Sequence, residues 1–417
     1  YADFFLGNLA LVLGTEVPVL GIVLPIGISF FTFTQIAFLA DAYAGKVNEY
    51  RFVYYVLFVT YFPHLIAGPV LHHKEMMPQF DEERNYRPQL PDLAIGATIF
   101  SIGLAKKVLI ADNLAGYASP VFAANAPSPD VLLGWGAALA YSFQLYFDFS
   151  GYSDMAIGLS RLFGVKLPLN FESPYKASNI SEFWRRWHMT LSRFLRDYLY
   201  IPLGGNRHGP LRRNLNLLTT MVLGGLWHGA GWGFVIWGAL HGLSLVINHA
   251  WQGLRARAPV SLPNGLTRPM AVALTFFVVV VGWVYFRSPD LATAHRVLGG
   301  MFGLQGIALP DGLMARLPFL EGVFNALSIR GTLGGGAQFV EMWIWVCLAA
   351  AIAFAAPNTQ QVMGRFKPAL RDDRHASPLA RRLIWRPTRT SAIVVGCLLA
   401  CGVLALSRPT EFLYFQF

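Results

Sequence analysis

Two neighbouring stretches decide how this chain is interpreted: SEFWRRWHMTLSRFLRDYLYIPLGG (181–205) and LGGLWHGAGWGFVIWGALHG (223–242). The first is amphipathic and rich in Arg and Trp, whereas the second is apolar and carries His228 and His241. An ionisable side chain at membrane depth is costly, so it marks a candidate functional site. We therefore expect the rest of the chain to be a membrane scaffold that holds these two stretches.

The composition is that of a membrane protein. Of the 417 residues, 54% are hydrophobic and 13% are charged, against roughly 25% charged in an ordinary soluble domain. Many apolar runs are long enough to cross a bilayer as helices. We predict an all-α polytopic membrane protein that forms one helical bundle over 1–417. The net charge of +10 does not indicate nucleic-acid binding, because the basic residues gather in loops beside apolar runs. The same loops are expected to contact membrane lipids.

The apolar runs predict membrane spans, whose bounds are 18–40, 50–71, 93–111, 131–149, 215–229, 231–250, 270–286, 341–356 and 391–406. The spans at 215–229 and 231–250 are joined so tightly that we expect a helical hairpin that ends inside the membrane. Basic loops favour the cytoplasmic side. This rule places residue 17 and loops 72–92, 150–214, 251–269 and 357–390 inside. It places 41–49, 112–130, 287–340 and the tail after Ser407 outside.

The segment 181–200 has apolar residues at helical spacing, interleaved with Arg185, Arg186, Arg193 and Arg196. This pattern predicts a helix at the cytosolic membrane surface. Two interpretations of its arginines are open. They bind lipid phosphates, or the helix tilts inward and its basic face receives an anionic substrate.

The histidines are weighed one at a time. His228 ends an apolar helix, and burial favours the neutral imidazole that a general base needs; a structural histidine bonded to a helix carbonyl is the alternative. His188 lies on the basic segment, where it is either a polar interfacial residue or a partner that the fold brings to His228. His241, Asp148 and Asp197 are candidates for supporting roles. No two histidines stand with a carboxylate at a ligand-like spacing, so no metal site is expected.

Taken together, these residues resemble the membrane-bound O-acyltransferase superfamily, and within it the bacterial alginate O-acetyltransferase membrane subunits. The resemblance covers nearly the whole chain, and the two histidine blocks together are its most specific part. From the resemblance we expect family members to have one or two N-terminal spans before the segment that corresponds to this chain. The blocks that carry the resemblance are GISFFTF (27–33), FPHLIAGP (62–69), YFDFSGYSDMAIGL (146–159), LPLNFESPY (167–175), EFWRRWHMTLSRFLRDYLYIPLGGNR (182–207), LWHGAGWGFVIWGALHG (226–242) and FLYFQF (412–417).

The resemblance implies a helical bundle with a central funnel or tunnel and in-plane or re-entrant helices, with 181–242 as its catalytic core segment. It implies that His228 is the histidine essential for catalysis and that His188 assists or positions. It also implies a multi-pass protein of the bacterial inner membrane that takes an acetyl group from a cytosolic thioester, acetyl-CoA or an acyl carrier protein, with no tightly bound cofactor. The acceptor is then an exopolysaccharide such as alginate, reached through periplasmic acetyl-transfer partners. The basic face formed by Arg185, Arg186, Arg193 and Arg196 suits the anionic donor.

Three other functions stay open at this point. One is acyl transfer to another acceptor, such as D-alanyl transfer to teichoic acid or transfer to cellulose, peptidoglycan or a secreted protein. Another is a polysaccharide exporter or flippase without chemistry of its own. A third, a structural scaffold for a secretion complex, leaves the cost of the buried histidines unexplained.

Overall fold

The computed structural model describes residues 1–407 except 19, 23–26, 48, 50, 66–67, 258–263 and 371–377. The FLYFQF block at 412–417 and part of the FPHLIAGP block therefore lie outside the described residues.

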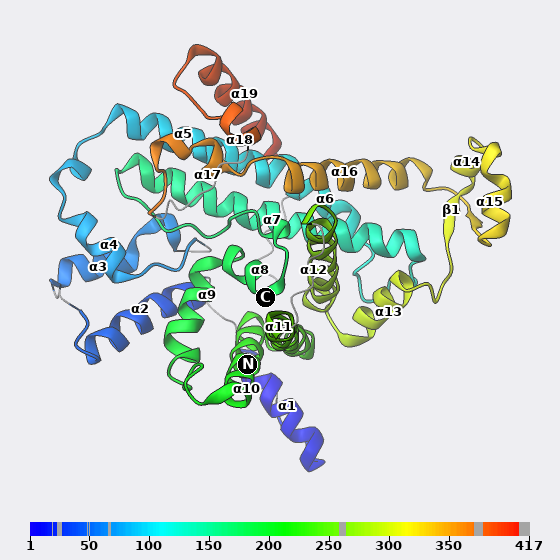
Figure 1. Cartoon of the computed structure of the whole chain (residues 1–417), viewed down its shortest axis with the longest axis horizontal. Coiled ribbons are helices and arrows are strands. Elements are labelled where there is room, and N and C mark those ends of the chain that lie inside the picture. The colour runs from blue at the N-terminus through cyan, green and yellow to red at the C-terminus, as the bar shows by residue number, and fades with distance from the viewer. Residues whose placement is uncertain are drawn as a thin grey trace.

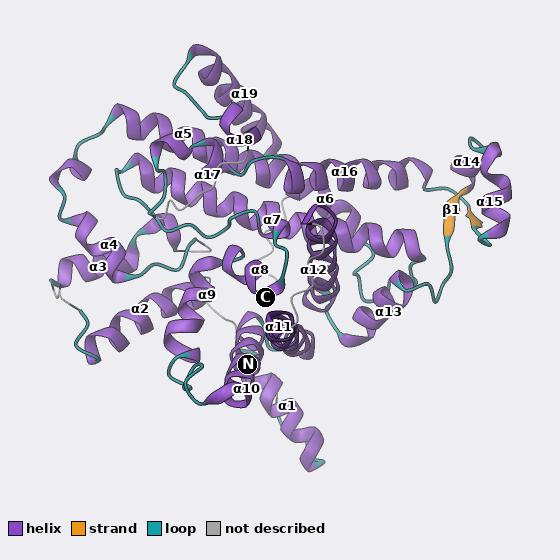
Figure 2. Cartoon of the chain, in the orientation of Figure 1, coloured by secondary structure: helices purple, strands orange, loops and turns teal. Residues whose placement is uncertain are grey.

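Helices dominate the described part, as expected, with two short parallel strands at one end (Figure 2). The longer helices are α1 (Ala2–Leu13), α2 (Ile28–Tyr43), α3 (Phe52–Thr60), α4 (His73–Phe80), α5 (Leu90–Ala105), α7 (Val131–Leu162), α10 (Gly209–His228), α11 (Trp232–Arg257), α12 (Asn264–Arg287), α13 (Leu291–Met301), α16 (Gly336–Ala355) and α19 (Arg389–Ala405). The short helices are α6 (Asp112–Ala118), α8 (Ile180–Arg186), α9 (Met189–Leu195), α14 (Asp311–Met314), α15 (Glu321–Ala326), α17 (Thr359–Val362) and α18 (Pro378–Arg382), and the strands are β1 (Ala308–Pro310) and β2 (Arg330–Thr332).

Helix α7 is the central element, and α5, α6, α12, α13 and α16 pack against it (Figure 1). It begins where the Asp130 side chain caps the free backbone N–H groups of Leu132 and Leu133. The predicted span ended at residue 149, but the helix continues for 32 residues to Leu162. Asp148 and Asp154 therefore lie buried within the helix.

Helices α5 and α7 touch at two glycine pairs, Gly96 with Gly158 and Gly103 with Gly151. A Cβ atom added to Gly103 would stand 2.6 Å from the Gly151 carbonyl oxygen, and one added to Gly96 would stand 2.6 Å from that of Gly158. Small residues allow such close backbone approach, which is how membrane helices associate. Because the glycines of each helix are seven positions apart, both pairs lie on one face of each helix.

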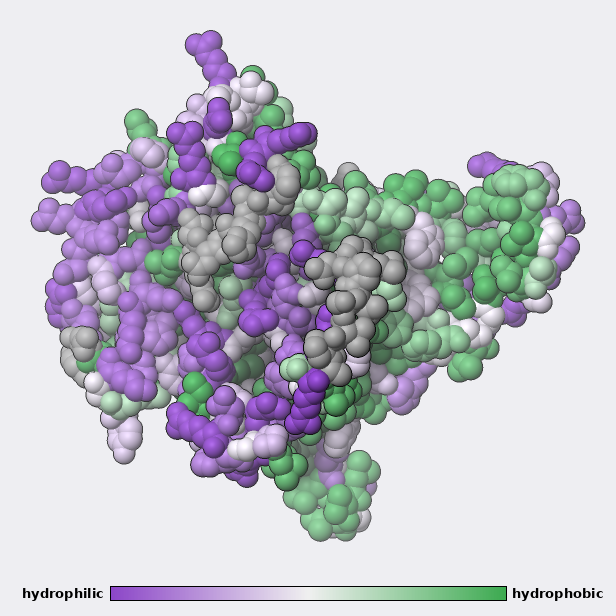
Figure 3. Space-filling view, viewed as in Figure 1, coloured by the Kyte–Doolittle hydropathy of each residue, from purple (hydrophilic) through white to green (hydrophobic). Residues whose placement is uncertain are grey.

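Four helical stretches are long and apolar enough to cross a membrane: Leu90–Ala118, Trp232–Arg257, Thr267–Arg287 and Gly336–Ala355. The first is continuous because a π-helical segment, Lys106–Ala111, joins α5 to α6. Helices α10 and α11 form a hairpin, as predicted, which turns at Gly229–Gly231 and packs closely at Gly225 and Gly238. That this hairpin ends inside the membrane stays a prediction. Hydrophobic residues cover α1, α16 and the region around β1, whereas hydrophilic residues gather around α3 and α4 (Figure 3).

The predicted span at 50–71 is wrong. Helix α3 has nine residues, which is about 14 Å at 1.5 Å per residue and too short for a bilayer core of about 30 Å. Asp41, at the end of α2, contacts His73 at the start of α4, and Arg51 pairs with Asp81 beyond α4. Loops 41–49 and 72–92 therefore share one side of the membrane, although the sequence placed them on opposite sides.

The segment 181–200 is a broken helix and not the continuous helix that was predicted. Helix α8 ends at Arg186, α9 begins at Met189, and a π-helical turn follows from Arg196 to Tyr200. His188 lies at the break with φ 42°, a left-handed conformation that non-glycine residues seldom adopt. The break turns the Trp187 and His188 side chains into the core.

Candidate functional site

His228 is the last residue of α10, at the tip of the hairpin, and its side chain is half-buried. Its ring meets Trp237 edge-on at a centroid distance of 5.2 Å and Phe286 at 5.0 Å. The aromatic walls hold the imidazole in place while part of it stays accessible. Of the three histidines in the two central stretches, His228 is the one with an exposed surface.

His188 lies beside His228, as the sequence analysis suggested. The two imidazoles are close enough to interact electrostatically, and the Phe30 ring contacts both the His188 ring and Trp227, the residue before His228. His188 is 1% exposed. Its Nδ1 lies 3.1 Å from Oδ1 of Asn170. The fold thus brings together two histidines that are 40 positions apart in the sequence.

His241 is buried among aromatic rings one layer deeper. Trp237 lies between it and His228, with centroid distances of 5.0 Å to His241 and 5.2 Å to His228. Trp184 and Trp283 cover other sides of the ring. Within the described residues, neither ring nitrogen of His241 has a hydrogen-bond partner. The structure therefore places His241 near the site but separates it from His228 by an indole ring.

Three of the four candidate donor-binding arginines already have carboxylate partners. Arg186 pairs with Glu182 at 2.6 Å, and Arg193 forms two hydrogen bonds to Glu75. Arg196 pairs with Asp197 on the surface, so Asp197 lies outside the histidine cluster. Arg185 is exposed, and in the described part of the chain it makes no ion pair.

The remaining acidic candidate, Asp148, faces away from the basic segment. Its carboxylate lies 2.6 Å from Nζ of Lys107, which also binds Asp112 at 2.6 Å. Asp154 pairs in the same way with Lys106. These contacts join α7 to the π-helical segment after α5, so the two adjacent lysines neutralise buried carboxylates inside the bundle.

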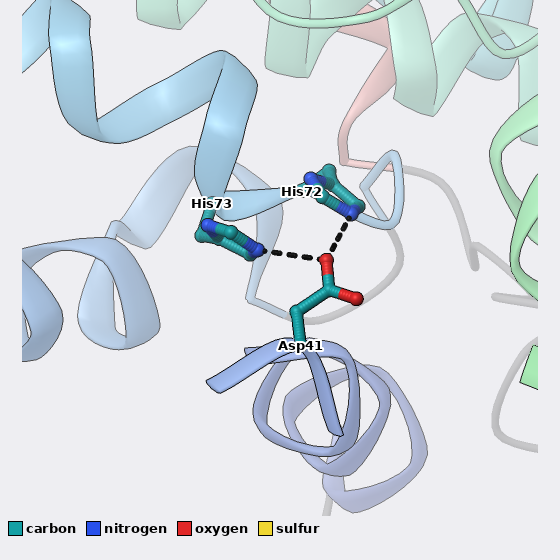
Figure 4. A group of neighbouring side chains, drawn as sticks. All are labelled: Asp41, His72 and His73. Carbon is teal, nitrogen blue, oxygen red and sulfur yellow. Dashed lines mark hydrogen bonds and ion pairs between the residues drawn. The ribbon is translucent and has the colours of Figure 1, made fainter. Parts of the chain in front are cut away.

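Asp41 forms a compact cluster with His72 and His73, two adjacent residues that lie about 30 positions further along the chain (Figure 4). Both Nε2 atoms point to the same oxygen of Asp41, at 3.3 Å from His72 and 3.0 Å from His73. Sequence spacing could not reveal this group, because its carboxylate comes from α2 and its imidazoles from the start of α4.

In the Asp41 cluster, hydrogen bonds from the two histidines to the carboxylate connect α4 to α2. Nδ1 of His72 accepts the backbone N–H of Lys74, so a neutral His72 carries its proton on Nε2 and donates it. Burial, with the neighbouring His73 and Arg193, lowers the pKa of His72 to about 4. The ammonium groups of Lys46 and Lys74 lie 4.0 and 3.9 Å from the Asp41 carboxylate and disfavour a cation there. The three side chains are thus better suited to linking α2 and α4 by hydrogen bonds than to binding a metal ion.

Sequence reasoning gave no role to Asn170 and Thr190, which surround His188. Asn170 is fully buried and belongs to the LPLNFESPY block. A buried asparagine needs hydrogen-bond partners for its amide. An asparagine within an apolar block was therefore the one sequence feature that could have indicated a specific role. Its partners could not be identified without the fold, because they lie 17 to 20 positions away.

The arrangement can carry out proton transfer at the edge of a hydrophobic enclosure. The His228 imidazole is partly buried and the nearby His188 imidazole is fully buried, and the aromatic rings around them exclude bulk water. Neutral imidazoles in such a setting can take a proton from an approaching hydroxyl group.

Comparison with known proteins gives a consistent result. The sequence model of the membrane-bound O-acyltransferase family matches residues 19–286. The chain is 47% identical to the peptidoglycan O-acetyltransferase of Helicobacter pylori, with 100% of this chain and 79% of that protein covered. It is 41% identical to the probable alginate O-acetylase of Pseudomonas aeruginosa, covering 95% and 77%. The teichoic acid D-alanyltransferase of Bacillus subtilis is 28% identical, covering 65% and 70%.

Proposed function

This chain belongs to the membrane-bound O-acyltransferase family, and from that premise we propose that it moves an acetyl group from a cytosolic thioester to a hydroxyl group of an envelope polysaccharide. The observation that carries the proposal is the position of His228. It is partly buried at the tip of the α10–α11 hairpin, close enough to the buried His188 for the two imidazoles to interact electrostatically. Helices α11 and α12, both long and apolar enough to span a membrane, contact its ring through Trp237 and Phe286, which supports a site that hydroxyl and thioester reach from opposite sides of the bacterial inner membrane.

In the proposed reaction, His228 moves one proton from the acceptor hydroxyl to the leaving thiolate in two steps. The His228 imidazole takes the proton of the acceptor hydroxyl as its oxygen attacks the thioester carbonyl carbon. The tetrahedral intermediate collapses as the carbon–sulfur bond breaks, and the imidazolium returns its proton to the leaving thiolate. The products are an acetyl ester and a free thiol. A neutral His228 is needed at the start of each cycle.

The donor is acetyl-CoA or an acetylated carrier protein, and Arg185 is the arginine best placed to bind it. Both donors carry phosphate, which a guanidinium group binds with two parallel hydrogen bonds. Arg186, Arg193 and Arg196 are occupied by Glu182, Glu75 and Asp197. A single arginine whose side chain is not ion-paired binds an incoming phosphate without breaking an existing pair.

The acceptor is a sugar hydroxyl outside the cytoplasm. Relatives named for acetylation of peptidoglycan and alginate are 47% and 41% identical over nearly the whole chain, whereas the D-alanyltransferase is 28% identical over part of it. These differences favour acetyl transfer to a polysaccharide over D-alanyl transfer. Periplasmic acetyl-transfer proteins would dock on the connection 287–340, which carries α13 to α15 and both strands at the end of the molecule (Figure 1).

The test is the acetate ester content of the envelope and secreted polysaccharides in cells that carry His228→Ala. We expect normal amounts of protein and polymer with the ester lost. Normal ester would overturn the assignment of His228, and loss of the polymer itself would favour an exporter.

A further inference from the structure

Asn170 holds the backbone and the ring of the strained His188 at the same time. Its backbone carbonyl accepts the N–H of Met189 at 2.9 Å, directly after the left-handed residue. Its side-chain Oδ1 lies 3.1 Å from Nδ1 of His188. Phe149 and Phe171 pack on the His188 ring at centroid distances of 4.8 and 6.3 Å. The ring orientation is therefore supported both by aromatic packing and by the contact with Asn170.

The orientation of the Asn170 amide is determined by its other neighbours. The same Oδ1 faces the backbone N–H of Thr190 at 3.3 Å, and a backbone N–H can only donate. The Thr190 hydroxyl accepts the N–H of Val70 at 2.9 Å, so its own proton is free to reach Asn170 Oδ1 at 3.0 Å. On the opposite side, the amide nitrogen faces Ser153 Oγ at 3.4 Å. A flipped amide would place its NH₂ group against the Thr190 N–H.

We propose that Asn170 is a positioning residue that keeps neutral His188 in the tautomer protonated at Nδ1. Because Oδ1 accepts at this position, Nδ1 of His188 donates, and Nε2 carries the lone pair. This inference rests on the proposed function, in which His188 assists His228. It means that neutral His188 acts through Nε2 as a hydrogen-bond acceptor, while His228 takes the hydroxyl proton. The hydrogen-bond donor to the oxyanion must then come from another group.

A structural role alone would also make Asn170 sensitive to mutation, because its contacts join three separate blocks of the sequence. The variant Asn170→Asp separates the two roles. A carboxylate accepts the same three hydrogen bonds and preserves the tautomer, but its charge favours the imidazolium form of His188. An opposite charge at this distance raises a histidine pKa by about 1 to 3 units. Since transfer needs neutral His188, the acid limb of the pH–rate profile should move to higher pH.

The experiment uses the purified chain in proteoliposomes, with acetyl-CoA as donor and de-acetylated glycan fragments of the host polymer as acceptor. We expect Asn170→Asp to stay active, with its acid limb displaced upward by about one pH unit or more. We expect Asn170→Ala to lower kcat by about 10²-fold or more while the donor KM changes little, because the ring is then free to adopt the other tautomer. The matched control is Asn358→Asp, another buried asparagine, whose side chain contacts Ser173 and Gln361 and no histidine; its pH profile should match the wild type.

Equal losses in Asn170→Asp and Asn170→Ala, with an unshifted profile, would reduce Asn170 to a structural residue and overturn the inference. A wild-type rate in Asn170→Ala would do the same. If Asn170→Ala does not fold, the pH profile of Asn170→Asp decides alone. Variants His228→Ala and His188→Ala are measured beside these. Retained transfer in both would contradict the proposed function, whereas loss in both with an unshifted Asn170→Asp profile would contradict the role of Asn170 alone.

Discussion

His228 and His241 are chemically identical, but their surroundings differ. His228 is only partly buried at the hairpin tip, whereas His241 is 1% exposed and packed against Trp184, Trp237 and Trp283. A general base must reach the proton that it removes. On the basis of accessibility we propose that His228 transfers the proton and that His241 has a packing role.

A pair of glutamine variants tests this assignment. His241→Gln removes an ionisable group behind an indole ring, so we expect transfer to fall by less than about tenfold. His228→Gln removes the proposed base, whose contribution to rate is about 10²- to 10⁴-fold. Acetyl transfer by both proteins in proteoliposomes is the measurement, with protein amounts matched. Equal losses in the two variants would show that His241 takes part directly.

Sequence reasoning found the two histidine blocks but could not give their geometry. Linear spacing does not show that Phe30 contacts both His188 and Trp227, or that Asp41 meets His72 and His73. The role of the arginines was also open, because their partners include Glu75, which lies 118 positions from Arg193. Long-range contacts of this kind need the fold.

At the scale of helices, the close approach of α5 and α7 sets the frame on which the site is built. Helix α7 contributes Phe149, which packs on His188, and Ser153, which faces Asn170. Between these two residues lies Gly151, one of the glycines that contact α5. The spacing of the α5–α7 pair is therefore linked directly to the surroundings of His188.

The variant Gly151→Ala should destabilise the protein. Its Cβ would stand 2.7 Å from the Gly103 carbonyl oxygen, so the helices must move apart, at a cost of about 1 to 3 kcal/mol. We expect a melting temperature several degrees lower in detergent. The matched control is Gly116→Ala in α6, where an added Cβ meets nothing within 4 Å. Its melting temperature should be unchanged or higher, since alanine favours the helix. Equal effects in the two variants would argue against the close glycine contact.

Helix boundaries show where sequence patterns succeed. The predicted hairpin is present because Gly229 and Gly231 interrupt a long apolar run at one point. The break at His188 was missed because the apolar periodicity continues across it from Phe183 to Phe194. Its cause is the pair of hydrogen bonds to Asn170, which no periodicity records.

At the scale of the whole molecule, the contacts of Asp41 revise the membrane topology. Loops 41–49 and 72–92 lie on one side. If the basic loops are cytosolic, then 41–49 is cytosolic too. The positive-inside rule failed here because it was applied to a span at 50–71 that the structure replaces with the short helix α3.

Cysteine labelling tests the revised topology. In a background without Cys347, Cys397 and Cys401, single cysteines replace the exposed residues Lys46 and Lys74. A membrane-impermeant maleimide should label neither in spheroplasts and both after lysis. Leu304→Cys, on the connection 287–340, is the external control and should be labelled in both states. Labelling of Lys46→Cys but not Lys74→Cys in spheroplasts would contradict the shared side.

The measurement that most directly tests the central claim is steady-state transfer from acetyl-CoA by purified His228→Ala protein in proteoliposomes. The account predicts that kcat falls by at least about 10²-fold while the donor KM stays within about threefold of the wild type, because His228 moves a proton and does not bind the donor. A kcat close to the wild-type value would contradict the assignment of His228 as the general base.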